Sequence, residues 1–172
     1  MSVQKFNKFP SLLYDDKQIV DITRRIALLG EVSNNASVLY EYSLRDDERP
    51  EDVAKRVYDD ENLYYVILII NNIVNVNTQW LKNESDLLAF VTLKYGEGNE
   101  NEVHHYETTE ESELGEGVWV NQTELFTTPI SNYEYEFQLN EEKRSIRLLR
   151  TRYLRDFINQ YQSIVSSGRS DL

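Results

Sequence analysis

The sequence predicts an α+β fold built around a small module of one strand and two helices at residues 36–80. Three observations predict it. Residues 39–44 alternate between two sets of side chains, as a strand with one buried face does. Pro50 suits the first turn of a helix, where a missing N–H group costs no hydrogen bond. Residues 63–70 are apolar on nearly every side, so the helix they form must be enclosed by other elements.

Local signals predict where these two helices begin and end. Glu51 and Asp52 place negative charge at the positive end of the first helix. Asp59 or Asp60 is suited to cap the second helix, and Asn71-Asn72 is expected to end it. The buried stripe of the first helix is expected to contain Val53, Ala54, Val57 and Tyr58.

The chain on either side of this module is predicted to form two further regions. An N-terminal arm and helix are expected at residues 1–35, and a C-terminal α+β extension with an acidic middle and a basic terminal helix at residues 81–172. Within the first region, apolar residues at helical spacing predict a helix over 19–29. Further elements are expected as a helix at 84–95 capped by Asn83, strands at 103–108, 117–122 and 133–139, a hairpin turn and strand within 140–149, and a helix at 151–165.

Composition excludes several classes of protein. The 172 residues include no cysteine, so neither a disulfide framework nor a thiolate metal site is possible. No stretch approaches eighteen consecutive apolar residues, and no membrane association is expected. A formal net charge of −12 argues against nucleic acid as a partner, because the acidic majority would repel phosphate.

The charge is strongly segregated along the chain. Residues 95–142 carry 13 acidic residues and no lysine or arginine, whereas residues 143–172 carry 7 basic and 2 acidic residues. Such segregation indicates that the basic tail meets an acidic surface, either of the same chain or of a partner. The alternative is that the acidic middle is simply solvated.

Residues suited to catalysis or metal binding are few, and no enzyme, cofactor, metal or small-molecule ligand is expected. His104 and His105 are adjacent in a predicted strand and are expected to point to opposite faces, so they could not share one metal. Asp46-Asp47-Glu48 lacks the glycine and ligand spacing of a calcium loop and is expected to be a solvated turn. The acidic residues between Glu97 and Glu124 share one wet environment, whereas general acid–base catalysis needs carboxylates in different environments.

The order of strand, charged turn, helix, short turn and helix resembles a LysM module. The chain has a closer resemblance to the baseplate wedge protein 53 family of contractile-tailed bacteriophages, which contains a LysM-like module of this kind. The residues that carry this resemblance are Arg49-Pro50-Glu51-Asp52-Val53-Ala54, then Tyr58, then Asn62-Leu63-Tyr64-Tyr65-Val66-Ile67-Leu68, then Asn71-Asn72-Ile73 and Trp80.

This resemblance implies a structural subunit of the virion tail baseplate, assembled in the host cytoplasm. Its partners would be other wedge subunits, which it would clamp together, and it would be present in multiple copies in a ring. Tyr, Trp and Arg combine large contact area with hydrogen bonding, so they are the expected interface anchors. For the aromatic residues, ordinary core packing is the alternative. The candidate interface residues are Phe9, Tyr14, Arg24, Arg49, Tyr64, Trp80, Arg147, Arg150, Arg152 and Arg155.

The alternative function is a LysM-type module that binds peptidoglycan or another glycan. Glycan-binding LysM modules resemble one another in a Gly-Asp-Thr turn after the first strand, and this chain has Asp47-Glu48-Arg49 there. Such a charged triplet would fill the sugar-binding groove and leave charges to desolvate. The sequence therefore favours the structural role.

Overall fold

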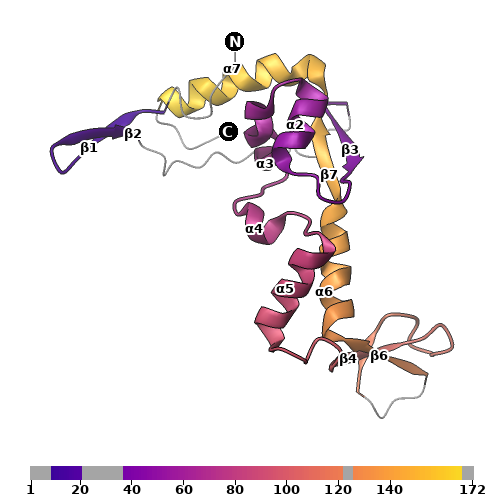
Figure 1. The fold of residues 1–172 in the computed structure, drawn as a ribbon. Coiled ribbons are helices and arrows are strands. Elements are labelled where there is room, and N and C mark those ends of the chain that lie inside the picture. The colour runs from indigo at the N-terminus through magenta and orange to yellow at the C-terminus, as the bar shows by residue number, and fades with distance from the viewer. Residues whose placement is uncertain (1–8, 21–36, 122–125, 168–172) are drawn as a thin grey trace. The chain divides into compact units, whose positions relative to one another are not determined.

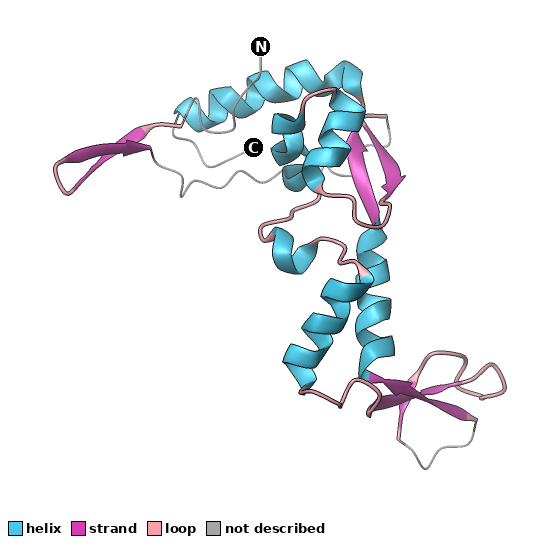
Figure 2. Cartoon of the chain, viewed as in Figure 1, coloured by secondary structure: helices cyan, strands magenta, loops and turns pink. Residues whose placement is uncertain are grey.

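The computed structural model describes residues 9–20, 37–121 and 126–167 (Figure 1). Helices and short antiparallel strands occur together, so the fold is α+β, as the sequence predicts (Figure 2). The strands form three small sheets, two of two strands and one of three.

The chain divides into two compact units. The first contains Met1–Trp80 together with Ser145–Leu172, and the second contains Leu81–Arg144. Ser145–Leu172 therefore groups with Met1–Trp80 in the structure. The domain bounds expected from the sequence, 1–35, 36–80 and 81–172, stay a prediction.

The first unit is built on one strand pair and two packed helices. Strand β3 pairs antiparallel with β7, with Leu39 opposite Leu149 and Ser43 opposite Ser145. Helices α2 and α3 pack on one another, and α3 packs on β7. The elements of this unit are β1 (Ser11–Tyr14), β2 (Lys17–Val20), β3 (Leu39–Ser43), α2 (Pro50–Tyr58), the 3-10 helix η1 (Glu61–Leu63), α3 (Tyr64–Ile70), α4 (Val76–Gln79), β7 (Ser145–Leu149) and α7 (Thr151–Ser167).

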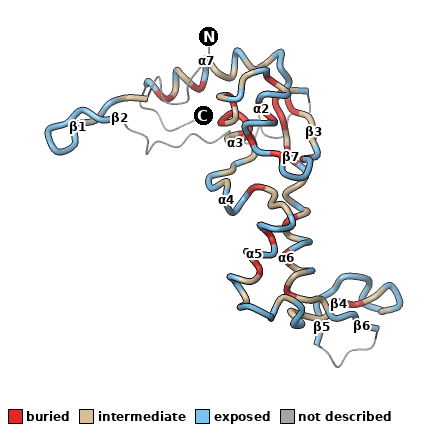
Figure 3. The backbone as a smooth tube through the Cα atoms, viewed as in Figure 1, coloured by how far each residue is buried: buried red, intermediate tan, exposed pale blue. Residues whose placement is uncertain are grey.

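The predicted helices of the central module are confirmed. Pro50 opens α2, and the main-chain N–H of Arg49 donates to the Asp52 carboxylate at 3.0 Å. Asp60 accepts the N–H of Asn62 and so caps the 3-10 helix that leads into α3. Most side chains of α3 are buried, and the buried residues of the unit gather in α2, α3 and β7 (Figure 3). The likeness of this arrangement to a LysM module stays a prediction.

The outer edge of β7 is closed by two side chains from the helical layer. Asn71 accepts the N–H of Arg147 and donates to its carbonyl oxygen, both at 2.8 Å. The Tyr58 hydroxyl accepts the N–H of Leu149 at 3.1 Å and donates to its carbonyl oxygen at 3.2 Å. These two side chains take the place of a third strand, because buried main-chain polar groups require partners.

Two buried tyrosines provide a matched test of this edge. We expect Tyr58→Phe to destabilise the first unit by about 1–3 kcal/mol, since it leaves the buried polar groups of Leu149 unpaired. Tyr65→Phe makes the same chemical change, but within the described residues the Tyr65 hydroxyl has no hydrogen-bond partner. We expect that variant to be neutral or slightly stabilising. Denaturant unfolding of both variants measures the difference, and equal effects would contradict the role given to Tyr58.

Glu48 holds the turn between β3 and α2 in place. Its carboxylate accepts the Tyr42 hydroxyl at 3.0 Å and the N–H of Arg45 at 3.0 Å, and it pairs with Arg56. Its carbonyl oxygen accepts the indole N–H of Trp80 at 2.8 Å. The predicted solvated turn is therefore wrong for Glu48, which is buried, because strand, turn, helix and Trp80 converge on it.

Strands β1 and β2 form a hairpin with a two-residue turn. Asp15 and Asp16 both have positive φ, which a tight type I′ hairpin turn requires. Ile19 lies in β2, so the predicted helix does not begin there. The rest of that predicted helix lies outside the described residues.

The second unit contains a helix pair and a three-stranded sheet. Asn83 caps α5 as predicted, by accepting the N–H of Asp86 at 2.8 Å. The sheet has the order β5-β4-β6, with both neighbours antiparallel to β4. The elements of this unit are α5 (Glu84–Tyr95), β4 (Val103–Thr108), β5 (Trp119–Val120), β6 (Thr127–Ser131), α6 (Asn132–Glu141) and the 3-10 helix η2 (Glu142–Arg144).

Two sequence predictions fail in this unit. Residues 133–139 are helical rather than extended, although their aromatic residues alternate. Ser131 and Glu134 form a capping box that starts α6, and this local hydrogen bonding outweighs the alternation. The predicted hairpin turn before Ser145 is wrong as well, because helical residues precede β7 and its strand partner is the distant β3.

Candidate protein–protein interface

Four of the predicted interface arginines lie in β7 and the start of α7. Arg147 is half-buried in β7 and lies directly opposite Glu41 of β3. Arg150, Arg152 and Arg155 are exposed. These four arginines are called the arginine strip. Pairing with β3 and the hydrogen bond from its N–H to Asn71 fix the main chain of Arg147, at one end of the strip.

Aromatic rings hold two of these guanidinium groups near the surface. The Arg150 guanidinium lies 5.7 Å from the centroid of the Tyr40 ring. The Arg152 guanidinium lies 4.7 Å from the Tyr153 centroid and donates a hydrogen bond to the carbonyl oxygen of Ser37 at 3.1 Å. Such cation–π contacts restrict the side chains while leaving the charges accessible. The strip is therefore suited to bind carboxylates, which arginine can contact in a bidentate manner.

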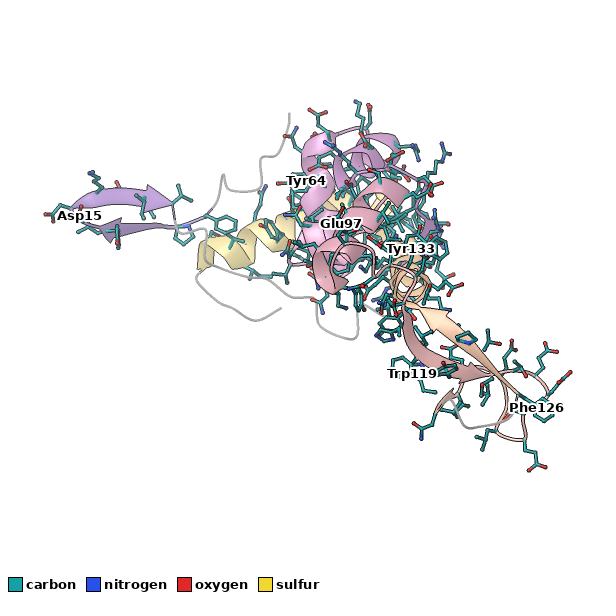
Figure 4. All side chains as sticks on the ribbon, turned by 60° about the horizontal axis from the view of Figure 1, so that its bottom comes forward. Asp15, Tyr64, Glu97, Trp119, Phe126 and Tyr133 are labelled. Carbon is teal, nitrogen blue, oxygen red and sulfur yellow. The ribbon has the colours of Figure 1, made fainter. Side chains whose placement is uncertain are left out.

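The other predicted residues are dispersed. Tyr14 is 69% exposed in the β1–β2 hairpin, which is a separate sheet. Arg49 is exposed at the start of α2, and Tyr64 is half-buried at the start of α3, where Figure 4 labels it (Figure 4). The Phe9 ring lies 6.5 Å from the ring of Tyr161, and Arg24 lies outside the described residues.

Trp80 is part of the chain's own core. Its side chain is buried, and its indole N–H donates to Glu48 within the first unit. The two alternatives for the aromatic residues were an interface anchor and ordinary core packing. Trp80 packs in the core, so its ring is not exposed to a partner.

A cluster of aromatic rings in the second unit corrects the prediction for the two histidines. The His104 and His105 Nδ1 atoms lie 2.9 Å apart, so the rings are on the same side of β4. A register shift between Val103 and His105 explains this, because a bulge breaks the alternation of side chains along a strand. His104 stacks on Tyr135 and His105 stacks on Trp119, both at 4.0 Å between centroids.

Packing within this ring cluster favours the neutral form of His104. Burial is the main cause of the lowered pKa of His104, and the neighbouring His105 lowers it further. Nearby, Glu136 is buried and accepts hydrogen bonds from the Lys94 ammonium at 2.6 Å and the Tyr95 hydroxyl at 2.8 Å. The ammonium group of Lys94 has its pKa raised chiefly by this contact with Glu136.

The sequence reasoning missed an exposed apolar surface on the second unit. Trp119 is 57% exposed and Phe126 is 53% exposed, and Figure 4 labels both at the three-stranded sheet. They lie within residues 95–142, the acidic stretch, for which contact with the basic tail and simple solvation are the two alternatives. The aromatic residues inside that stretch could have indicated this surface, because large exposed apolar side chains mark interaction sites rather than solvated loops.

The described residues contain neither a cluster suited to a metal ion nor a helix suited to cross a membrane. Within residues 9–20, 37–121 and 126–167, no three or more histidine or acidic side chains are placed to hold a metal ion. In the same part of the chain, no helix combines the length and apolar character needed to cross a bilayer.

Arginines and aromatic residues are exposed on several separate elements of this α+β chain. These residue types are enriched in the surfaces by which proteins bind other proteins. Residues 32–124 match the family of base plate wedge protein 53, which is more than half of the 172 residues. The chain belongs to this family of structural proteins of the phage baseplate. No curated protein matches it.

Proposed function

We propose that this protein clamps other wedge subunits together during assembly of the phage tail baseplate. The family match supports a structural role in the baseplate and a place in the virion tail. It also favours this role over the glycan-binding alternative. Its partners are other baseplate wedge subunits, and it acts without a cofactor.

The arginine strip is the observation that supports this proposal most directly. Arg147 lies in β7 and the N–H of Arg150 donates to the carbonyl oxygen of Val38, while the exposed Arg152 and Arg155 lie in the first turns of α7. Interfaces are enriched in arginine and tyrosine, and buried charge pairs there give specificity. The strip therefore supplies a positively charged contact surface for an acidic partner surface.

Charge reversal tests the strip. We expect Arg152→Glu combined with Arg155→Glu to leave the first unit folded and to block incorporation into wedge complexes, because like charges facing each other across an interface cost several kcal/mol. Co-expression with candidate wedge subunits, followed by sedimentation of the product, measures incorporation.

A control with the same change in charge separates this effect from net charge. Arg45→Glu combined with Lys55→Glu reverses two exposed basic residues of the same unit away from the strip. We expect that variant to assemble normally. Normal assembly of the Arg152→Glu, Arg155→Glu protein would exclude the strip as the contact surface and would move the contact to the N-terminal arm around Phe9, Tyr14 and Arg24.

A further inference from the structure

Within the described residues, one edge of the β3–β7 sheet is closed by side chains, and no strand pairs with the other edge, along β3. The N–H and carbonyl groups of Arg147 and Leu149 point away from β3, since Asn71 and Tyr58 bind them. In an antiparallel pair, the residues opposite such positions also point their polar groups outward. Their partners in the register are Glu41 and Leu39.

Glu41 is the exposed point of this edge, whereas Leu39 is buried. Within residues 9–20, 37–121 and 126–167, no hydrogen bond reaches the main-chain N–H or carbonyl group of Glu41, which is exposed. Proteins usually protect an edge strand, because an open edge is a template for pairing with another chain. In the second unit Pro129 lies in the edge strand β6, and β5 is only two residues long. Strand β3 has neither form of protection.

A second feature of the chain matches this open edge. The β1–β2 hairpin is formed by two four-residue strands, and β3 has five residues. Large apolar side chains of the hairpin are exposed, including Leu13 at 74% and Ile19 at 42%. A two-stranded hairpin has marginal stability alone, whereas three or more strands with an apolar face are stable. The hairpin is therefore an element that gains from pairing.

We infer that the β1–β2 hairpin of one copy of this protein pairs with the outer edge of β3 in a second copy. The product is a four-stranded sheet in which β3 lies between β7 and the hairpin of its neighbour. One opposite-charge pair across the strands is available, since Lys17 of the hairpin is a cation and Glu41 lies in the middle of β3. This contact between copies goes beyond the proposed contacts with other wedge subunits.

The first test is self-association of the purified full-length chain. We expect sedimentation to detect oligomers at protein concentrations of about 100 μM, which corresponds to a weak interface. Glu41→Pro removes the outward N–H and spares the β3–β7 ladder, since proline is tolerated where the N–H of an edge strand faces solvent. We expect this variant to associate at least about tenfold more weakly, a change that the affinity scale resolves clearly. Glu41→Ala keeps the N–H and is expected to associate within roughly threefold of the unmodified chain.

The second test identifies the pairing partner, and it remains decisive if Glu41→Pro fails to fold. The chain has no cysteine, so single cysteines label one site each. One protein carries Glu41→Cys and the other carries Gln18→Cys. Strands in a sheet lie about 4.8 Å apart, so a bismaleimide that spans about 10 Å joins paired strands without demanding one register. We expect covalent heterodimers in this mixture. As a control, a protein with Glu61→Cys in the 3-10 helix η1 is mixed with the Gln18→Cys protein, and we expect no heterodimers there.

Three results would overturn the inference. The first is that the purified chain stays monomeric up to about 500 μM. The second is that a protein carrying both cysteines forms the cross-link only within one chain. The third is that the Glu41→Pro protein is folded and associates as strongly as the unmodified chain. The purified chain is tested alone, so each of these results would leave the proposed binding to other wedge subunits intact. Conversely, normal self-association of the Arg152→Glu, Arg155→Glu protein would show that its assembly defect arises elsewhere.

Discussion

Ile67→Ala is expected to destabilise the first unit by about 4 kcal/mol, within the usual range for truncating a large buried aliphatic side chain. Ile67 lies at the centre of α3 and has no exposed surface. The helix packs on α2 and β7, so the surrounding elements cannot collapse freely into the space that the substitution leaves. The loss therefore includes both the transfer free energy of the removed atoms and the cost of a cavity.

The chain offers a local reporter and a matched control for this measurement. It has two tryptophans, Trp80 in the first unit and Trp119 in the second, so fluorescence of Trp80 in a Trp119→Phe background follows unfolding of the first unit. Ile69→Ala removes the same atoms from a half-buried position of α3 and is expected to cost less than half as much. An unchanged midpoint for Ile67→Ala would mean that α3 is stabilised by a partner rather than by its own unit.

Glu48→Ala is expected to destabilise the first unit by about 3 kcal/mol. The substitution removes the acceptor for the Tyr42 hydroxyl and for the N–H of Arg45, and hydrogen bonds to charged groups contribute about 1.5–3 kcal/mol each. Arg56 loses its partner too, but it is 40% exposed and regains hydration, which limits the total.

Glu48→Gln separates the charge of this residue from its shape. The amide keeps one acceptor oxygen but loses the ionic contact with Arg56, so we expect roughly half the loss seen with alanine. The same Trp80 fluorescence measures both variants, and the Glu48 carbonyl that binds the indole is present in each. Equal stability of the alanine variant and the unmodified chain would show that the turn is held by its main chain alone.

Elements with local signals could be predicted from the sequence. Pro50 with its following acids starts α2, and Asn83 caps α5, because these side chains act on main-chain groups within a few residues. The family resemblance and the α+β class were likewise within reach, since the motif from Arg49 to Ile73 is contiguous.

Features that depend on distant residues could not be predicted in this way. The pairing of β3 with β7, the burial of Trp80 against Glu48 and the bulge at His105 are set by tertiary contacts that no local spacing encodes. Of the candidate interface, the sequence located the exposed arginines after β7 but also included Trp80. Residue type alone does not separate a core tryptophan from an interface tryptophan, because both positions favour large aromatic rings.

The second unit is an insertion whose two ends are tied together. The N–H of Lys82 donates to the side-chain oxygen of Asn140 at 2.9 Å, and the Asn140 amide donates to the Lys82 carbonyl at 2.8 Å. Leu39 and its partner Leu149 are 149 − 39 = 110 positions apart in the sequence. The Lys82–Asn140 hydrogen bonds bridge 140 − 82 = 58 of these positions, so the loop that must close for β3 to pair with β7 is effectively shorter. Shortening this loop from 110 to 52 positions lowers the entropic cost of its closure by only about 0.7 kcal/mol.

The connectivity also sets an order of events during synthesis. A ribosome releases β3, α2, α3 and the whole second unit before β7, so the nascent chain carries β3 without its partner strand until residues 145–149 emerge. Vectorial synthesis thus makes β7 the strand that closes the first unit, after the second unit has been synthesised.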